Sequence, residues 1–411
     1  MQSPRKKILL LDTGNEWGGG TNSMLELLRR IDRQRFDICC CFYHNYRQGE
    51  GETIEQVLNS IAIPVIFLAQ RRQPRWAGFL KECLRDVVFF SRPLRRRITV
   101  FVDTLWRIKL NAQRIRHLLQ QQQFDILYMN NQPASNEEGY RAAMGLPVSV
   151  VQHCRIEPVL DARIVNWVNR RADAIIAVSE GVKHALISHG VTAEKCTAVY
   201  NAIDINQPLP NRQQMRHELL DIDDDTFVFG SIGSLITRKA HHHTLQAIAR
   251  FAAANPDAAW RLVILGEGPE MSALRQQAAE SGIADRVIFT GFRNNPLAYL
   301  ATFDVFILAS KSEGLPRVIL EAMLLKSAVI GSKVTGTAEL ITNNINGLLF
   351  NYGDVDTLYQ QIQLLYHDQH KRQSLTEQAN ANVRQHYAIE HYVSGVETIL
   401  QTVNHGNITH V

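Results

Sequence analysis

The sequence predicts an α/β protein with two domains, each a doubly wound parallel sheet. Three observations support this prediction. The chain has 411 residues, of which 45% are hydrophobic and only 20% charged, so it can fill two packed domains and does not have the composition of a disordered protein. Short apolar runs alternate with amphipathic stretches of helical period. The alternation is interrupted once, between residues 200 and 225, and then starts again.

The first domain is expected over residues 1–200. It begins with a strand at 7–11 and an amphipathic helix at 21–31, the first of several strand, loop and helix units. Each later strand is followed by turn residues or by a helical stretch, which is the pattern of parallel strands joined by helical crossovers. These further buried strands are expected at 36–42, 64–68, 126–129, 148–152 and 174–178.

Residues 201–225 are expected to be a linker, because they carry two prolines, several amide side chains and an acidic run at 221–225. The second domain is expected over 226–385, and residues 386–411 should form a C-terminal helix and tail that can pack back on the first domain. The elements of the second domain are expected at 227–232, 242–254, 262–265, 271–281, 287–290, 305–309, 316–325, 328–331 and 347–350, with helices from 354 onward.

The cysteines and the N-terminus favour a cytoplasmic protein. Six cysteines occur without a CxxC pair, and three of them are adjacent inside an expected strand, which indicates reduced, structural thiols. The apolar run before Asp12 has about five residues, too few for the core of a signal peptide. No stretch approaches the roughly 20 apolar residues of a membrane span. A peripheral position at the cytoplasmic face of a membrane is compatible with this interpretation.

The charge is unevenly distributed along the chain. The net charge is +4, too small over this length to favour general nucleic-acid binding. Residues 71–116 contain 13 basic and three acidic residues, so this stretch carries +10 and the rest of the chain −6. Within 71–119, apolar residues recur at helical spacing beside the arginines. This segment could lie on an anionic membrane, or its apolar stripe could pack on the sheet. A basic groove for a phosphorylated glycolipid fits both alternatives.

In open parallel sheets, ligands bind beyond the carboxyl ends of the strands, so the loops there should carry the functional residues. The first such loop places three glycines at 18–20 before a helix, where backbone N–H groups and the helix dipole could hold an anion. A flexible turn explains the glycines equally well. Neither this cluster nor the one at 230–235 has GxGxxG spacing, so a dehydrogenase is disfavoured.

A second loop carries two glutamates at a defined spacing. In SEGLPRVILEAM, Glu313 precedes a helix, Pro316 suits its first turn, and Glu321 follows eight positions after Glu313. The amides of the loop could hold a phosphate, while the carboxylates accept hydrogen bonds from sugar hydroxyls. A solvated glutamate on a helix face is the simpler alternative. The apolar residues around Glu321 argue instead for a buried helix, where a carboxylate needs a polar partner.

These residues resemble the family-four retaining glycosyltransferases, which have the GT-B fold of two Rossmann-like domains facing across a cleft. SEGLPRVILEAM is similar to the family's Glu, seven residues, Glu motif. Other family motifs recur in the same order over nearly the whole chain, namely GGG, AVSEGVKHAL, VYNAID, LVILGEGPEMSAL, VIFTGF and GTAELITNNINGLLF. The resemblance is strongest to the branch that builds lipopolysaccharide core and surface polysaccharides.

The resemblance implies a nucleotide-sugar donor bound mainly by the second domain and an acceptor bound mainly by the first. Glu321 would hold the ribose, and Glu313 would contact hydroxyls of the donor sugar. Further donor contacts would come from Gly19, Gly266, Gly268, Gly291, Phe292, Arg293, Gly314, Leu315 and Val318. The nucleotide sugar is a substrate, so no cofactor is expected.

One departure from the family is expected to be informative. The usual diphosphate-binding arginine is replaced by Ser234 in GSLITRKAH, and Arg238 beside Lys239 could take its place. Either arrangement supplies two cations for the departing nucleoside diphosphate. The alternative is a pair of solvated cations at a helix start, which the helix dipole disfavours.

His153 lies at the end of an expected strand, where the family commonly has a histidine that touches the donor sugar, although a lone histidine is more often structural. No residue has the pattern of a dedicated nucleophile. The resemblance implies attack from the same face, with the acceptor proton passing to the departing phosphate. The acidic run at 221–225 is expected to be a solvated turn, and the three adjacent histidines at 241–243 point in different directions, so no metal site is expected.

The sequence therefore predicts a retaining, metal-independent glycosyltransferase that acts on a cell-surface glycan or a lipid-linked acceptor. The alternative is a nucleotide-sugar epimerase of similar fold, which would act on the donor alone. An inactive binding or scaffold protein is disfavoured, because Glu313, Glu321 and Lys239 are all present.

Overall fold

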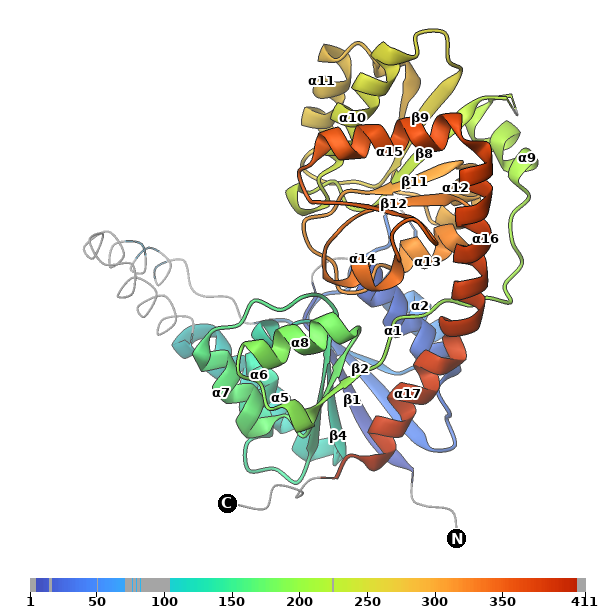
Figure 1. The fold of residues 1–411 in the computed structure, drawn as a ribbon. Helices are drawn as coiled ribbons and strands as arrows, with labels where there is room; N and C mark the ends of the chain where they lie inside the picture. The colour runs from blue at the N-terminus through green and yellow to red at the C-terminus, as the bar shows by residue number, and fades with distance from the viewer. Residues whose placement is uncertain are drawn as a thin grey trace.

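The computed structural model describes residues 5–14, 17–49, 51–70, 104–223 and 225–404, together with 76, 79 and 82. Two parallel sheets form the centres of two domains, which confirms the predicted fold class (Figure 1). The first sheet has seven strands in the order β3-β2-β1-β4-β5-β6-β7, and the second has six in the order β10-β9-β8-β11-β12-β13. In each sheet the order reverses beside the first strand, which is the doubly wound pattern.

The central strands of the first sheet are short and apolar, and their residues are mostly buried on both faces. In β4 all five residues, ILYMN, are buried, as expected for a parallel strand covered by helices. The strands of this sheet are β1 (Lys6–Asp12), β2 (Phe36–Phe42), β3 (Val65–Phe67), β4 (Ile126–Asn130), β5 (Ser149–Cys154), β6 (Ala174–Ala177) and β7 (Cys196–Ala198). Its helices are α1 (Gly19–Arg30), α2 (Ile54–Ser60), α5 (Lys109–Gln122), α6 (Glu137–Ala143), α7 (Ala162–Arg171) and α8 (Glu180–Ser188).

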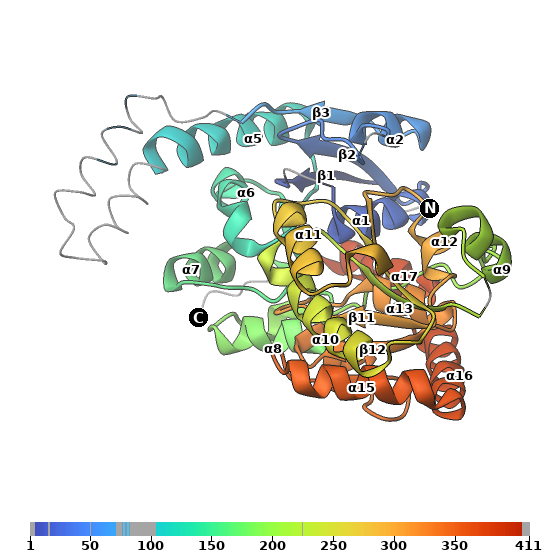
Figure 2. The same ribbon diagram turned by 90° about the horizontal axis from the view of Figure 1, so that it is seen from above.

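The second sheet is built in the same way from the second half of the chain. Its strands are β8 (Phe227–Ile232), β9 (Trp260–Leu265), β10 (Val287–Gly291), β11 (Val305–Leu308), β12 (Ala328–Ser332) and β13 (Leu348–Phe350). Its helices are α10 (His241–Ala254), α11 (Met271–Glu280), α12 (Pro296–Leu300), α13 (Arg317–Leu324), α14 (Thr335–Leu340), α15 (Val355–His367) and α16 (Gln369–His386). Seen from above, α15 and α16 lie along the side of the molecule opposite to α5 and β3 (Figure 2).

The C-terminal helix α17 (Ile389–Thr402) leaves the second domain and packs beside α1 on the first (Figure 1). Its apolar face, including Tyr392, Val396 and Leu400, belongs to the core formed by α1 and β1. The Lys6 ammonium of β1 donates to the carbonyls of Leu400, Gln401 and Val403 at 3.1, 2.8 and 3.0 Å. The chain thus crosses between the domains a second time.

The segment expected as a linker contains helical structure that packs on the second domain. It forms α9 (Arg212–Met215) and a π-helical turn over Arg216–Leu220. The guanidinium groups of Arg212 and Arg216 bind the two oxygens of Asp304, at 2.5 and 2.6 Å. Asp304 also accepts a hydrogen bond from the Val228 N–H at 2.8 Å, so this ion-pair group ties the segment to the start of β8.

Within the basic segment, the apolar face of helix α5 packs inward, whereas Trp76 and Phe79 are exposed. Ala112, Ile115 and Leu119 of α5 are buried in the core of the first domain. Arg116 donates to the carbonyl of Ala142 at 3.2 Å. Most of 71–103, including Arg95, Arg96 and Arg97, lies outside the described residues. Within the described ranges, none of the helices has the length and apolarity needed to cross a bilayer.

Candidate active site

Three predicted catalytic residues lie together beyond the carboxyl ends of two paired strands of the second sheet. Arg238 and Lys239 follow β8, and Glu313 follows β11. The Lys239 Nζ donates to Glu313 Oε1 at 2.6 Å, and the Arg238 Nη1 lies 3.6 Å from the same oxygen. Arg238 also donates to the Ser312 carbonyl at 2.7 Å. Two cations therefore surround one carboxylate at this edge of the sheet.

The environment of Glu313 keeps its carboxyl group ionised. The side chain is 8% exposed, and burial by itself raises its pKa. The charges of Lys239 and Arg238 outweigh burial and hold the pKa of Glu313 below its ordinary value. Because the carboxylate balances only one of the two cations, one positive charge remains. A net positive group at the carboxyl edge of a parallel sheet favours an anionic ligand.

The residues after Glu313 are held by both domains. A Cβ on Gly314 would lie 2.2 Å from the Arg155 carbonyl oxygen of the first domain. On the other side, a Cβ on Gly336 of α14 would lie 1.8 Å from the Gly314 oxygen. The Asn201 side-chain amide donates to the Leu315 carbonyl at 3.0 Å. Glycine is needed at 314 because backbone approaches it this closely, and the loop is fixed at the domain junction.

Glu321 lies on α13, the helix that follows this loop. The nearest cation is Arg317, one turn earlier, at 3.6 Å. Burial raises the pKa of Glu321, Arg317 offsets this in part, and the carboxylate of Glu26 in α1 adds to the rise. Val318, on the same helix, is half-buried. A carboxyl group in these surroundings is stabilised in its ionised form by additional donors such as ligand hydroxyls.

Two glycine-rich turns lie beside the cation pair, at the ends of β9 and β10. Gly266 and Gly268 have φ of 141° and 158°, and a Cβ would lie 2.0 Å from the Gly233 oxygen and 2.3 Å from the Leu235 oxygen. The Gly266 N–H donates to the Gly291 carbonyl at 2.9 Å. Only glycine permits such packing, which brings the turns after three neighbouring strands together.

Phe292 contacts the other domain. A Cβ on Gly49, which has φ of 57°, would lie 2.2 Å from Cδ1 of the Phe292 ring. The Phe292 N–H donates to Glu267 at 3.2 Å, and the Arg293 Nε donates to the Tyr299 hydroxyl at 3.1 Å. Phe292 is thus close to the first domain, while Arg293 is held within the second. Their contact with a nucleobase stays a prediction.

The glycine turn of the first domain is open at the start of α1. Among the described residues, which omit 15 and 16 of this loop, a Cβ on Gly18 or Gly19 would meet nothing within 4 Å, while Gly20 faces the Arg155 side chain at 3.7 Å. Ser234, which stands where the family resemblance implies an arginine, is exposed after β8. The role of Gly19 at the donor stays a prediction.

His153 is more deeply buried than its sequence position indicates. The strand runs to Cys154, so His153 lies inside β5, and none of its surface is exposed. Its Nδ1 is hydrogen-bonded to the Tyr128 hydroxyl, and its ring lies 6.2 Å from that of Tyr392. Burial, followed by the Arg155 charge, holds the pKa of His153 well below its ordinary value, so the ring is neutral. A contact with the donor sugar stays a prediction.

A buried polar network beside His153 was not anticipated from the sequence. The Arg155 guanidinium donates to Asn130 at 2.8 Å and to the Tyr392 hydroxyl at 3.0 Å. Asn130 in turn donates to Asp12 at 2.7 Å. These residues come from the ends of β1, β4 and β5 and from α17. Each is unremarkable in its own segment, and the only sequence signal is that polar side chains end three buried strands.

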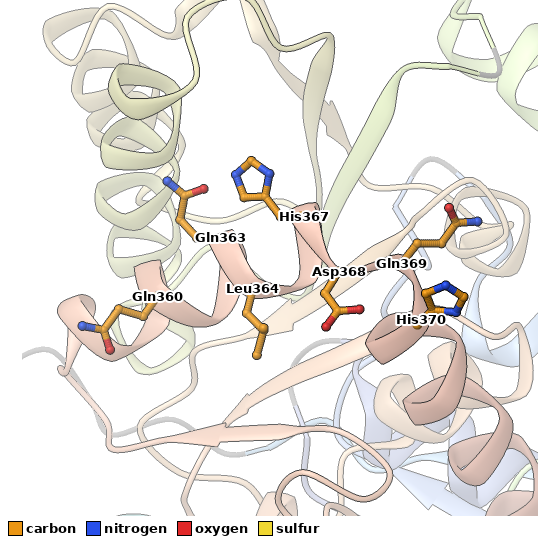
Figure 3. A pocket seen from close by; sticks show the side chains of 7 residues that line it. All are labelled: Gln360, Gln363, Leu364, His367, Asp368, Gln369 and His370. Atoms are coloured by element: carbon orange, nitrogen blue, oxygen red, sulfur yellow. The ribbon is translucent and has the colours of Figure 1, made fainter.

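An open pocket lies where α15 meets α16, and Figure 3 shows its side chains around the end of α15. None of its seven lining residues is among the predicted site residues. They are Gln360, Gln363, Leu364, His367, Asp368, Gln369 and His370. The group of Arg238, Lys239 and Glu313 lies instead beyond the carboxyl ends of β8 and β11, where parallel sheets bind ligands.

Sequence comparison identifies both halves of the chain. The model of Glycosyltransferase Family 4 matches residues 17–207, and that of Glycosyl transferases group 1 matches residues 213–382. An N-acetylgalactosaminyltransferase of Campylobacter jejuni, named for a diphospho-undecaprenol acceptor, is 28% identical over 54% of this chain and 58% of its own length. The lipopolysaccharide core biosynthesis glycosyltransferase LpsE of Rhizobium meliloti is 30% identical over 39% of this chain and 46% of its own length. The chain therefore spans about half the length of these curated relatives.

Solved structures with the same fold cover the whole chain. HepE from Anabaena, solved with UDP and glucose, aligns with a TM-score of 0.75 and 22% identity over 97% of this chain and 100% of its own. The lipopolysaccharide outer core galactosyltransferase WaaB aligns with a TM-score of 0.66 and 18% identity over 96% of this chain and 99% of its own. These likenesses show the GT-B fold. The two family models, which together match residues 17–207 and 213–382, show that the chain belongs to the family-four, group 1 glycosyltransferases.

Proposed function

We propose that the protein is a retaining, metal-independent hexosyltransferase. It moves a sugar from a nucleotide-sugar donor to a cell-surface glycan or lipid-linked acceptor in lipopolysaccharide or polysaccharide biosynthesis. The observation that carries the proposal is the group of Arg238, Lys239 and Glu313 beyond β8 and β11, which has one positive charge in excess. Relatives named for lipopolysaccharide and diphospho-undecaprenol substrates support the acceptor class.

In the proposed reaction, Arg238 and Lys239 bind the diphosphate. The acceptor hydroxyl attacks the anomeric carbon from the face that the diphosphate leaves, the bond from that carbon to the phosphate oxygen breaks, and the hydroxyl proton passes to that oxygen. Negative charge on the diphosphate grows as the bond breaks, so two preorganised cations stabilise the transition state more than the ground state. No covalent intermediate with the protein is required.

Glu313 and Glu321 have different tasks in this proposal. Glu313, held ionised by Lys239, accepts hydrogen bonds from hydroxyls of the donor sugar. Glu321 accepts hydrogen bonds from the ribose hydroxyls. Burial raises the pKa of Glu321, and hydrogen bonds from the two ribose hydroxyls stabilise its ionised form. The Glu321→Ala variant should therefore weaken donor binding by about 1.5–3 kcal/mol in titration calorimetry. Glu377→Ala, an exposed change on α16, is the control.

The decisive experiment is a screen of nucleotide sugars with and without extracted glycolipid or glycan acceptors. Transfer that depends on acceptor and continues in EDTA supports the proposal, and NMR of the product should show the anomeric configuration of the donor. Conversion of the donor alone into an epimer would contradict it. Inverted products, or activity that EDTA abolishes, would contradict the retaining or the metal-independent part of the proposal.

The proposed location is the cytoplasm, at the inner face of a membrane, with residues 71–116 providing the contact. Near an anionic surface each Lys or Arg contributes on the order of 1 kcal/mol, and the effect fades within a Debye length of about 10 Å at 0.1 M salt. Replacing Arg95, Arg96 and Arg97 by Ala should release the protein from anionic liposomes without lowering activity on a soluble acceptor. Unchanged cosedimentation, or equal binding to neutral liposomes, would contradict this membrane contact.

A further inference from the structure

The first turn of α8, in the first domain, is capped by a residue of the second domain. A helix leaves its first four N–H groups without partners in the helix itself. In α8 the Ser179 hydroxyl accepts from the Val182 N–H at 3.1 Å. The N–H groups of Glu180 and Gly181 donate to the two carboxylate oxygens of Glu339, at 2.9 and 2.7 Å. Glu339 therefore completes the cap and places its charge at the positive end of the helix dipole.

The contact requires glycine at position 181. A Cβ there would lie 2.4 Å from Cγ2 of Thr335 and 2.7 Å from Oε1 of Glu339. Gly181 is not among the residues with positive φ, so backbone conformation does not explain it. The reason for glycine here is the close approach of α14, which carries Thr335 and Glu339 and lies next to α8 (Figure 1).

Glu339 also reaches the chain that connects the domains. Its charge also acts on Tyr200, which precedes the connection: burial followed by the charge of Glu339 raises the pKa of Tyr200 to about 12. The Tyr200 ring packs edge-on against Tyr387 at 6.1 Å, where the chain crosses back between α16 and α17. One carboxylate thus contacts α8 and adjoins both crossings of the chain.

The same helix α14 supports the loop of the candidate active site. Its Gly336 packs against the Gly314 carbonyl, next to Glu313. From the other side, the first domain contacts this loop through the Arg155 backbone, and the Asn201 amide at the start of the connecting segment donates to it. Helix α14 therefore lies between α8 and the loop that carries Glu313. A shift of α14 away from α8 would move the two domains apart at the site.

We propose that Glu339 is a positioning residue whose cap on α8 holds the acceptor domain in place against the donor loop. This inference rests on the proposed function. Glu339 acts through α14 and does not touch the substrates. Separation of the domains breaks the hydrogen bonds between the Glu339 carboxylate and the two N–H groups of α8. The contact therefore favours the closed arrangement that transfer requires.

The test breaks the contact from each side. Glu339→Gln removes the charge, and Gly181→Ala pushes the carboxylate away from the amides. An alanine normally stabilises a helix relative to glycine, so opening caused by Gly181→Ala cannot come from a weaker α8. The control is Glu180→Gln, in the same turn, because the Glu180 side chain pairs with Lys183 of its own helix at 3.2 Å. The full chain is used throughout.

We expect small-angle X-ray scattering to give a larger radius of gyration for Glu339→Gln and Gly181→Ala than for the parent and Glu180→Gln. With an active donor, kcat should fall about tenfold in each variant while donor KM changes little, because hydrogen bonds to a charged group are lost from the closed state. The double variant should lose no more kcat than the more impaired of the two single variants, because both changes break the same contact.

Additive losses in the double variant, or an unchanged radius of gyration in both single variants, would overturn the proposal. Circular dichroism and thermal unfolding distinguish domain opening from loss of the fold, and a variant that unfolds is replaced by Glu339→Asp, which keeps the charge but shortens the reach. If no nucleotide sugar is turned over, the scattering comparison still decides whether Glu339 holds the domains together, so this inference and the proposed function can be rejected separately.

Discussion

At the scale of single residues, the pKa values of two carboxyl groups in the donor loop and the helix after it are shifted in opposite directions. The charges of Lys239 and Arg238 lower the pKa of Glu313, so it stays ionised. Burial raises the pKa of Glu321 and thereby disfavours its ionised form. The lowered pKa of Glu313 contributes stability above its unfolded pKa, and this contribution is lost as pH falls through the folded value. The raised pKa of Glu321 has the reverse sign: stability is lost as pH rises above the unfolded pKa.

The Glu321→Gln variant should therefore be more stable than the parent at neutral pH. Above an unfolded pKa of about 4.3, the folded parent binds more protons at Glu321 than the unfolded chain does, so its stability falls with rising pH. Glutamine removes this penalty and keeps the shape. Urea unfolding at pH 4.5 and 7.5 should show a gain that is larger at pH 7.5. A gain of the same size at both values would show that ionisation is not its cause.

The Lys239→Ala variant should lower kcat more than it raises donor KM. Its ammonium is proposed to stabilise charge that develops only as the diphosphate departs, and removing one such group costs roughly 10²–10³ in rate. The matched control is Lys311→Ala, an exposed lysine in the same loop. Steady-state kinetics with equal kcat in Lys239→Ala and parent would remove Lys239 from the reaction.

At the scale of elements, the 201–225 segment shows how tertiary contacts build structure where local pattern predicts a linker. Its prolines and acidic run are typical of a connection. The segment nevertheless forms helical turns, and the ion pairs from Arg212 and Arg216 to Asp304 hold these turns on the second domain. The Arg216 side chain is 4% exposed and Asp304 is half-buried, so the loss of Asp304 leaves the buried Arg216 charge without this partner.

The Asp304→Asn variant should lower the free energy of unfolding of the second domain by about 3 kcal/mol. It removes the charge that faces Arg212 and Arg216 while keeping the shape of the side chain. Guanidinium unfolding should show this loss, and the exposed change Asp285→Asn should not. Equal midpoints for the two variants would mean that the Asp304 charge does not stabilise Arg216.

At the scale of the whole molecule, the last helix joins the two domains. Helix α17 is separated from β1 by almost the entire chain, yet it supplies part of the core around α1. The first domain therefore cannot complete its core until the C-terminus has been made. This arrangement also places Tyr392 beside Arg155 and His153, so the buried network depends on the same helix.

The Leu400→Ala variant should destabilise the first domain by about 2–5 kcal/mol, because it leaves a cavity between α17 and its neighbours. Leu400 is 1% exposed. Hydrogen exchange should accelerate at the amides of β1 and α1, although both lie at the opposite end of the sequence. Glu390→Ala, an exposed change on the same helix, provides the comparison. Faster exchange confined to α17 would show that the helix frays independently.

The sequence alone determined the two sheets, because a parallel strand covered on both faces must be a short apolar run and its helices must carry one apolar stripe. It also identified Glu313 and Glu321 as candidates, because one ends the loop after a strand and the other lies in the helix that follows, while Lys239 came from the family resemblance. Both kinds of inference use contacts that are local in the chain. For the same reason, the strand at 126–129 was found and its polar neighbour Asn130 was not connected to Asp12.

Only the tertiary structure decided the burial of His153, the network around Arg155, the return of α17 and the cap of α8 by Glu339. Each depends on residues that are far apart in the sequence and that meet through strand order or domain placement. Hydrophobic periodicity reports which face of an element is buried, but not against which partner. The partner is fixed when the two sheets and their crossings pack together, and that packing is what places the glutamate of one domain on a helix of the other.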